Sequence, residues 1–225
     1  MKDDSIARYI DHTLLRPDAT ADDIVRLCEE TASFGFASAC VASCWASFAR
    51  EQLDLLDRNT VPVCCVVGFP FGSASTAAKA EEARRAVEDG AGEIDMVINV
   101  GFLRSGLDDK VAGEIEAVVN ASCGAIVKVI VETCYLTDEQ KIAAARYARD
   151  AGAEFVKTST GYGPAGARPE DVRLLAREVP GIRIKASGGI RTYEQAWKFL
   201  KAGASRIGTS SGPAIMAEIP LAGRP

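Results

Sequence analysis

Eight short β-rich runs alternate with longer helical segments along this chain, and this alternation is what most constrains the fold. The runs occupy residues 11–15, 37–41, 61–67, 93–98, 125–131, 154–158, 182–186 and 205–209. Segments between them carry apolar residues at helical spacing, and Thr137 with Gln140 and Thr192 with Gln195 have capping-box spacing at two helix starts. No Pro/Gly/Ser-rich linker divides the chain. The pattern predicts an α/β fold, a single (β/α)8 (TIM) barrel domain over residues 1–225. A doubly wound open sheet is the alternative, although it usually has fewer strands and often a glycine-rich first turn that this chain lacks.

The charge and hydropathy of the chain exclude several kinds of partner. Of the 225 residues, 48% are apolar and 25% charged, and the formal net charge is -5 at pH 7. Nothing in this balance points to nucleic acid or to an anionic membrane. The N-terminus lacks the apolar segment of a signal peptide, and no apolar run approaches the ~18 residues of a membrane span. We therefore expect a cytoplasmic protein.

The cysteines and the single histidine restrict the chemistry further. Seven cysteines, an odd number without CxxC spacing, argue against a disulfide framework or a thiolate zinc site, so we expect them to be buried small hydrophobes. His12 is the only histidine, which excludes a histidine-pair metal site, and we expect it to make a structural hydrogen bond.

Three segments, "DGAGEID", "AGAEFVK" and "AGASRIG", place a Gly-Ala pair where a helix should end. Five residues after each of these glycines come Asp95, Lys157 and Gly208. In a fourth segment, "PGIRIKA", Lys185 follows its glycine by four residues. Because each of these residues follows its glycine by four or five positions, we expect them to lie at about the same height, near the C-terminal ends of their strands. The active site of a barrel lies at this end.

Two lysines and a carboxylate at a barrel mouth suggest amine chemistry. A lysine amine attacks a carbonyl only when neutral, so its pKa must fall from ~10.4, and a second ammonium nearby lowers it by repulsion. Lys185 would tune Lys157, or the reverse, and Asp95 would move protons. Polar residues follow Lys157, which predicts a wet site. No metal or other cofactor is required. The alternative is an ordinary, partly buried charge network.

Glycines and serines after the last two predicted strands supply a second signal. "SGGIRT" places Gly188 and Gly189 before a helix start, and "GTSSG" places Ser210 and Ser211 after the last strand. Backbone N–H groups at such turns bind phosphate oxygens, and hydroxyls add donors. Barrels commonly bind phosphate in these two loops.

The chain resembles the deoxyribose-phosphate aldolases, a family of class I aldolases with a (β/α)8 fold. The resemblance runs from "YIDHTLLRPDAT" through "VKVIVETCYLTDEQ" to "RIGTSSG" and is most specific in "VKTSTG" and "KASGGIR". It implies Lys157 as the Schiff-base lysine, Lys185 as the lysine that perturbs it, and Asp95 as the acid/base residue. It also implies phosphate contacts from Gly161, Gly188, Gly189, Ser210 and Ser211. The implied reaction is reversible cleavage of 2-deoxy-D-ribose 5-phosphate to acetaldehyde and D-glyceraldehyde 3-phosphate.

Two segments depart from the family pattern. The family often has Val-Asn-Pro after the position of Cys40, where this chain reads "VASCWASF". Some members end in a tyrosine that reaches the site, whereas "AEIPLAGRP" offers none. The sequence leaves open the oligomeric state, a homo-oligomer included. Two other functions keep the glycine turns without needing both lysines: another phosphate-binding barrel enzyme, an isomerase or synthase, and a non-catalytic sugar-phosphate binding protein.

Overall fold

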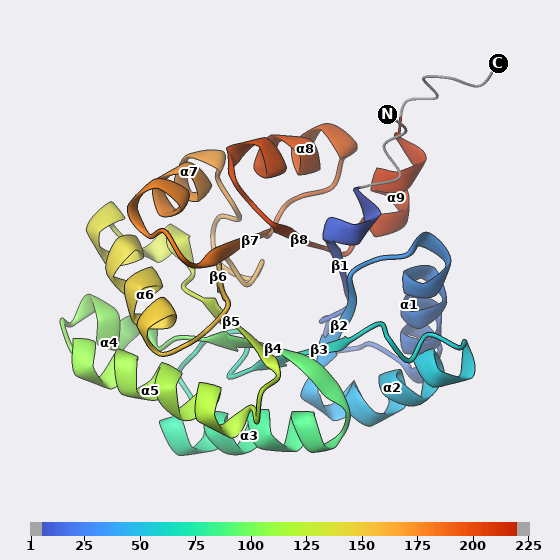
Figure 1. Ribbon diagram of the computed structural model, residues 1–225, viewed down its shortest axis with the longest axis horizontal. Coiled ribbons are helices and arrows are strands. Elements are labelled where there is room, and N and C mark those ends of the chain that lie inside the picture. Colours follow the sequence, from blue (N-terminus) through green and yellow to red (C-terminus); the bar gives the residue numbers. More distant parts are fainter. Residues whose placement is uncertain (1–5, 220–225) are drawn as a thin grey trace.

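A computed structural model describes residues 6–219 and shows a closed barrel of eight parallel strands surrounded by helices (Figure 1). Each strand pairs with the next along the chain, and β1 also pairs with β8, with Ile10 opposite Ile207. The strands are β1 (Ile10–Thr13), β2 (Ser38–Ala42), β3 (Val63–Val67), β4 (Ala91–Val97), β5 (Ile126–Ile130), β6 (Phe155–Lys157), β7 (Arg183–Ser187) and β8 (Arg206–Thr209). The predicted single-domain (β/α)8 barrel is confirmed, and the closure between β1 and β8 rules out an open sheet.

Every predicted run overlaps one of these strands, and the predicted and observed ends differ by at most two residues. The predicted third run, 61–67, includes Pro62, which has no N–H to donate to a ladder. The observed strand begins at Val63, and the Pro62 carbonyl accepts a hydrogen bond from the Ala39 amide.

Helices form a ring outside the barrel (Figure 1). They are α1 (Ala21–Phe34), α2 (Ala46–Leu55), α3 (Thr76–Glu88), α4 (Val100–Arg104), α5 (Asp108–Ala121), α6 (Asp138–Asp150), α7 (Pro169–Glu178), α8 (Tyr193–Ala202) and α9 (Gly212–Ala217), with 3-10 turns η1 (Ala7–Tyr9), η2 (Ser43–Trp45) and η3 (Thr133–Tyr135). Both predicted capping boxes are present, at the starts of α6 and α8. Gly90, Gly152 and Gly203 have positive φ, of 97°, 88° and 113°, as their predicted place after a helix requires.

Side chains alternate along each strand between two very different environments. On β4, Ile94 and Met96 belong to the apolar core between the strands and the helices. Glu93 and Asp95, at the alternate positions, are also buried but make ion pairs with residues of other strands. The interior of the barrel is therefore lined with charge where many barrels have stacked aliphatic residues, and this interior positions the candidate site.

The histidine prediction is confirmed and the cysteine prediction holds in part. His12 is buried, and its Nε2 lies 2.7 Å from Glu30 Oε2. Four cysteines (Cys28, Cys40, Cys64 and Cys65) are buried as expected, but Cys44 and Cys123 are exposed. The expectation of burial is wrong for those two, because both lie in surface connections outside the strands. All seven thiols are free.

Within residues 6–219, no helix is long and apolar enough to cross a membrane. Residues 220–225, to which most of the tail without a tyrosine belongs, lie outside the described part of the chain.

Candidate active site

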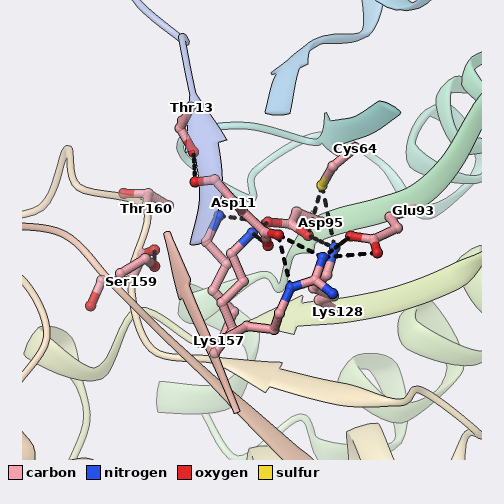
Figure 2. Close-up of polar contacts among 12 residues, drawn as sticks. Asp11, Thr13, Cys64, Glu93, Asp95, Lys128, Lys157, Ser159 and Thr160 are labelled. Atoms are coloured by element: carbon pink, nitrogen blue, oxygen red, sulfur yellow. Dashed lines mark hydrogen bonds and ion pairs between the residues drawn. The ribbon is translucent and has the colours of Figure 1, made fainter. Parts of the chain in front are cut away.

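Asp95, Lys157 and Lys185 meet inside the barrel, as their common height predicts. Figure 2 shows Asp95 and Lys157 among the other charged residues there. Lys157 on β6 and Lys185 on β7 are direct register partners. Both amines donate to the same oxygen of the β4 carboxylate: Lys157 Nζ lies 2.8 Å from Asp95 Oδ2, and Lys185 Nζ lies 2.7 Å from it. The two ammonium groups thus share one carboxylate oxygen, an arrangement that depends on three different strands.

Four further charged residues complete a ring that the sequence did not predict. Lys185 also pairs with Asp11 Oδ2 at 2.5 Å, and Arg206 Nε donates to Asp11 Oδ1 at 2.8 Å. Arg206 Nη2 contacts both oxygens of Glu93, Glu93 pairs with Lys128 at 2.6 Å, and Lys128 returns to Asp95 Oδ1 at 2.8 Å. Opposite charges alternate around this closed ring, and Lys157 is attached to it at Asp95.

The ion pairs of this ring determine the protonation states of Asp95 and Lys185. Burial opposes ionisation of Asp95, but the ammonium groups of Lys128, Lys157 and Lys185 outweigh it and hold the pKa of Asp95 well below its usual range. Burial likewise favours a neutral Lys185, but the Asp11 and Asp95 carboxylates hold the pKa of Lys185 above its usual range. Lys185 is therefore a cation at neutral pH, and Asp95 is a carboxylate.

Of the two lysines, Lys157 faces open space. It lines a cavity of about 350 Å³ at the C-terminal ends of the strands, whereas Lys185 has no exposed surface and is absent from the part of the cavity wall formed by residues 6–219. Gly208, which reaches a similar height, gives Lys185 room: a Cβ there would lie 3.0 Å from Lys185 Cε. Of these two lysines, Lys157 therefore lines the cavity and Lys185 lies behind its wall.

The polar residues after Lys157 are buried, so the expectation of a wet segment is wrong for them. Thr158, Ser159 and Thr160 are at most 8% exposed. Thr158 Oγ1 accepts from the Ser187 amide at 3.1 Å, and the amide and hydroxyl of Thr160 both donate to Glu132 Oε2. Through these hydrogen bonds, the loop after β6 is held to Ser187 at the end of β7 and to Glu132 after β5.

Glu132, which the sequence reasoning missed, has an unusual backbone. It lies just after β5 with φ of 55° and ψ of 68°, a left-handed conformation that is uncommon for a residue other than glycine. Its side chain is buried and holds Thr160, next to Gly161 in the cavity wall. A strained backbone at the end of a barrel strand is the kind of feature that clusters at functional sites.

Four of the five predicted phosphate-binding residues line the cavity, and one does not. Gly161, Gly188, Gly189 and Ser210 line it. Among residues 6–219, the amides of the three glycines donate to no protein acceptor, which leaves these donors for a ligand. Ser211 is outside the lining, and its amide donates to Thr209 Oγ1 at 2.9 Å.

Charge in the cavity wall favours an anion. Over the described part of the chain, the wall includes the cations Lys157, Arg16 and Arg191 and no carboxylate. The sequence reasoning missed both arginines, although Arg191 directly follows the "SGGI" motif and Arg16 the "HTLL" run.

Cys40 and Cys64 are register partners on β2 and β3, and their sulfurs lie within 4.8 Å of each other and of an Asp95 oxygen. Of these three groups, the two thiols are ligands for soft metal ions. A metal ion there would, however, be repelled by Lys128, Lys157 and Lys185, which already contact Asp95.

The segment after Cys40, where the sequence differs from the family pattern, does not reach the cavity at Ser43. Ser43 Oγ donates to Glu82 Oε1 at 2.8 Å, and Ser43 lies outside the cavity lining formed by residues 6–219.

Comparison with known proteins identifies the family. The sequence matches the profile of the "DeoC/LacD family aldolase" over residues 5–218. The chain belongs to the DeoC/LacD aldolase family. A deoxyribose-phosphate aldolase of Methanocella arvoryzae is 66% identical over 216 residues, which cover 96% of each chain. A deoxyribose-phosphate aldolase of Thermococcus gammatolerans is 53% identical over 214 residues, which cover 94% of this chain and 95% of the relative.

A solved deoxyribose-phosphate aldolase shares the fold. The deoxyribose-phosphate aldolase from Aeropyrum pernix, described as a unique tetrameric structure, superposes with a TM-score of 0.86 at 35% identity, covering 95% of this chain and 90% of that chain. The predicted resemblance and the assignment to the aldolases, which are carbon–carbon lyases, are confirmed.

Proposed function

We propose that this chain reversibly cleaves 2-deoxy-D-ribose 5-phosphate to D-glyceraldehyde 3-phosphate and acetaldehyde through a Schiff base on Lys157. The observation that carries the proposal is the placement of Lys157: the residue lines the cavity, and its Nζ shares Asp95 Oδ2 with Lys185. The names of the two relatives that match nearly the full chain support the substrate.

Lys157 is the nucleophile in this proposal, and Lys185 stays charged. An amine must be neutral to attack a carbonyl. Lys185 cannot meet this condition near neutral pH, because Asp11 and Asp95 stabilise its ammonium form. Its ammonium contacts the same Asp95 oxygen as Lys157 and places a positive charge beside the nucleophile. Attack by the Lys157 amine on the substrate carbonyl, followed by loss of water, gives the imine.

The imine then withdraws electrons from the adjacent carbon–carbon bond. In the cleavage direction, the C3 hydroxyl loses a proton, the C2–C3 bond breaks, and its electron pair passes to the imine to form an enamine. D-Glyceraldehyde 3-phosphate leaves, the enamine carbon is protonated, and water releases acetaldehyde and the Lys157 amine. No external oxidant or reductant is needed in this sequence.

Asp95 is the proposed acid/base residue, and its role depends on the stage of the reaction. Three ammonium groups keep it ionised in the free protein, which makes it a weak proton acceptor at that stage. When Lys157 loses its charge on forming a neutral intermediate, one of these three cations disappears and the proton affinity of Asp95 rises. Asp95 can then exchange protons at the reacting centre, directly or through water.

The other end of the cavity is proposed to bind the phosphate. Gly161, Gly188 and Gly189 offer backbone N–H groups, Ser210 offers a hydroxyl, and Ser211 adds a donor if the loop after β8 shifts toward the ligand. Arg16 and Arg191 add positive charge.

Reductive trapping tests the proposal. Acetaldehyde with borohydride should leave an ethyl group on Lys157, located by peptide mass mapping, and the wild-type protein should turn over 2-deoxy-D-ribose 5-phosphate. Lys157→Arg should abolish both results, since a guanidinium stays protonated and forms no imine. Lys198→Arg, at an exposed position on α8, is the matched control and should retain both. An adduct mapped mainly to Lys185 would contradict the assignment.

We further infer that the protein is a homo-oligomer and that it acts in the cytoplasm. The tetrameric description of the Aeropyrum pernix aldolase supports the first point. A phosphorylated sugar is a charged substrate that does not cross a bilayer unaided, which supports the second.

A further inference from the structure

The Tyr162 side chain spans the mouth of the barrel. It belongs to the loop after β6, and its hydroxyl donates to the Leu15 carbonyl, in the loop after β1, at 2.8 Å. Its ring also contacts that of Phe69, in the loop after β3, with the centroids 5.4 Å apart and the planes at 90°. In the closed order of eight strands, β6 lies opposite the β1–β3 side (Figure 1), so this one side chain reaches across the opening.

Two cavities lie on either side of Tyr162. The cavity of about 350 Å³ that contains Lys157 is lined by loops after β1, β6, β7 and β8. A second cavity, of about 240 Å³, is lined by loops after β3, β4, β5 and β6. Among residues 6–219, Thr160 and Tyr162 are the residues that line both. Thr160 is buried and tied to Glu132, which leaves the half-exposed Tyr162 ring as the movable part of the wall between the cavities.

The second cavity has mainly apolar walls. Phe71, Val97, Val100 and Tyr135 contribute to them, and Arg104 and Glu132 add one charge of each sign. A closed apolar cavity of about 150 Å³ can hold a benzene ring. At about 240 Å³, the second cavity has room for a phenyl group or a short alkyl chain, and its balanced charge gives no preference for an anion.

The contacts of Tyr162 differ in strength between its backbone and its side chain. The backbone amide donates to Thr160 Oγ1 at 3.0 Å, and Thr160 is held in turn by the buried Glu132. Tyr162 is 51% exposed, and among residues 6–219 its side chain is held by one hydrogen bond of the hydroxyl and one contact between rings. A single exposed hydrogen bond contributes only about 1 kcal/mol, so the ring can swing while the loop stays in place.

We propose that the second cavity is a binding site for the apolar substituent of an aldehyde substrate, and that the Tyr162 ring is the wall that restricts access to it. This inference rests on the proposed aldolase function. In the direction of carbon–carbon bond formation, the enamine on Lys157 attacks the carbonyl carbon of the acceptor aldehyde. The substituent of D-glyceraldehyde 3-phosphate extends toward the glycine loops, whereas a phenyl or alkyl substituent would extend past Tyr162 into the second cavity.

Acceptor selectivity measures the effect of the wall. With acetaldehyde as donor, kcat/KM is determined for phenylacetaldehyde and for D-glyceraldehyde 3-phosphate as acceptors. Tyr162→Ala should raise the ratio of the first to the second by about tenfold or more, the range that one or two apolar groups contribute to selectivity. Tyr162→Phe keeps the ring and removes only the hydroxyl bond to Leu15, so its ratio should rise far less.

A double variant tests whether the phenyl group of the acceptor occupies the second cavity. Val100 lines the second cavity and not the first. Adding Val100→Phe to Tyr162→Ala should fill the second cavity and remove the gain for phenylacetaldehyde. A gain that persists in the double variant, an unchanged ratio in Tyr162→Ala, or an equal gain in Tyr162→Phe would each overturn the inference. If Tyr162→Ala fails to unfold cooperatively, Tyr162→Leu makes the same comparison.

The outcome for the wild type separates this inference from the proposed function. A wild-type protein that neither cleaves 2-deoxy-D-ribose 5-phosphate nor forms the adduct on Lys157 contradicts the proposed function itself. An active wild type whose acceptor ratio does not respond to Tyr162→Ala contradicts only the role of the second cavity.

Discussion

At the scale of single residues, the proposed mechanism depends on how Lys157 and Lys185 differ in their partners and in their access to the cavity. Lys157 and Lys185 contact the same Asp95 oxygen, but Lys185 has the additional carboxylate of Asp11. The two lysines are alike in sequence, each near the end of an apolar run. In the proposed function, these different partners and the different access to the cavity give Lys157 and Lys185 different roles.

Replacing Lys185 tests whether repulsion between the two ammonium groups keeps Lys157 reactive. In Lys185→Leu this repulsion is lost, while the Asp11 and Asp95 carboxylates remain. The pH profile of imine trapping with acetaldehyde and borohydride should therefore show a lower rate at pH 7, by about tenfold for a repulsion of ~1.4 kcal/mol.

Lys185→Arg is the matched control for that measurement. A guanidinium retains the positive charge, so the trapping profile should stay close to that of the wild type. Urea unfolding of each variant establishes that it is folded. A profile that is unchanged in Lys185→Leu would show that Lys185 has some role other than charge repulsion.

At the scale of elements, the loops after β5 and β6 are joined through Glu132 and Thr160. The Glu132 carboxylate accepts from both the amide and the hydroxyl of Thr160, and Gly161 follows in the cavity wall. In Glu132→Ala these two donors lose their acceptor, and the cavity wall should loosen. We expect kcat/KM for 2-deoxy-D-ribose 5-phosphate to fall by about tenfold or more, since a lost hydrogen bond to a charged group corresponds to about 1.5–3 kcal/mol.

Glu132→Gln provides the comparison, because an amide oxygen can still accept from Thr160. It should retain most of the activity. Equal losses in Glu132→Ala and Glu132→Gln would indicate that the carboxylate charge matters and the connection between the loops does not.

The loop after β7 allows a separate test of phosphate binding. A Cβ on Gly189 would meet no atom within 4 Å, so a side chain there enters open space beside the cavity. The φ of 81° adds backbone strain for any other residue. Gly189→Val should therefore raise KM far more for 2-deoxy-D-ribose 5-phosphate than for unphosphorylated 2-deoxyribose. Equal increases for both substrates would mean that this loop supports the barrel and does not bind phosphate.

The elements were easier to predict from the sequence than the complete site. Eight strands and two capping boxes follow from local patterns, because a β-rich run or a Thr-x-x-Gln spacing acts over a few residues. Counting from the glycines also brought Asp95, Lys157 and Lys185 together. Lys128, however, was missed although it too is a lone lysine in an apolar run, "AIVKVIV". The position of a residue along a strand does not show whether its side chain points into the barrel or toward the helices. The register between neighbouring strands, which brings Lys128 next to Asp95, is set only when the barrel closes.

The bridge made by Tyr162 could not have been predicted for a related reason. It joins residues 147 positions apart in the sequence, and its contacts exist only because the loops after β1, β3 and β6 meet at one end of the barrel. No local pattern in "TGYG" distinguishes a tyrosine that spans the mouth from one that points to solvent.

At the scale of the whole molecule, the ring of charges crosses the barrel interior from β4 and β5 to the place where the first and last strands meet. Asp11 on β1 accepts from Ser38 Oγ on β2 at 2.7 Å, pairs with Lys185 on β7, and accepts from Arg206 on β8. The Asp11 carboxylate on β1 thus contacts residues of β2, β7 and β8, and so connects the first two strands to the last two. Removing one partner from a buried set of ion pairs leaves the others uncompensated and costs about 3–5 kcal/mol. Asp11→Asn should accordingly lower the free energy of unfolding at neutral pH.

The pH dependence of this loss provides the decisive measurement. Burial raises the pKa of Asp11, but Lys185, Lys128 and Arg206 together hold it below its usual range in the folded protein. In the unfolded chain the pKa returns to about 3.9. The stabilisation by Asp11 is therefore fully present above about pH 4 and decreases as the pH falls toward the lower folded value. Urea unfolding midpoints of the wild type and Asp11→Asn should differ most between about pH 5 and 8 and converge as the pH falls below about 4. Asp22→Asn, at an exposed position in the first turn of α1, should show only a small difference from the wild type at every pH. A difference for Asp11→Asn that stays constant down to the acid limit would show that the carboxylate acts through its shape and hydrogen bonds, and not through its charge.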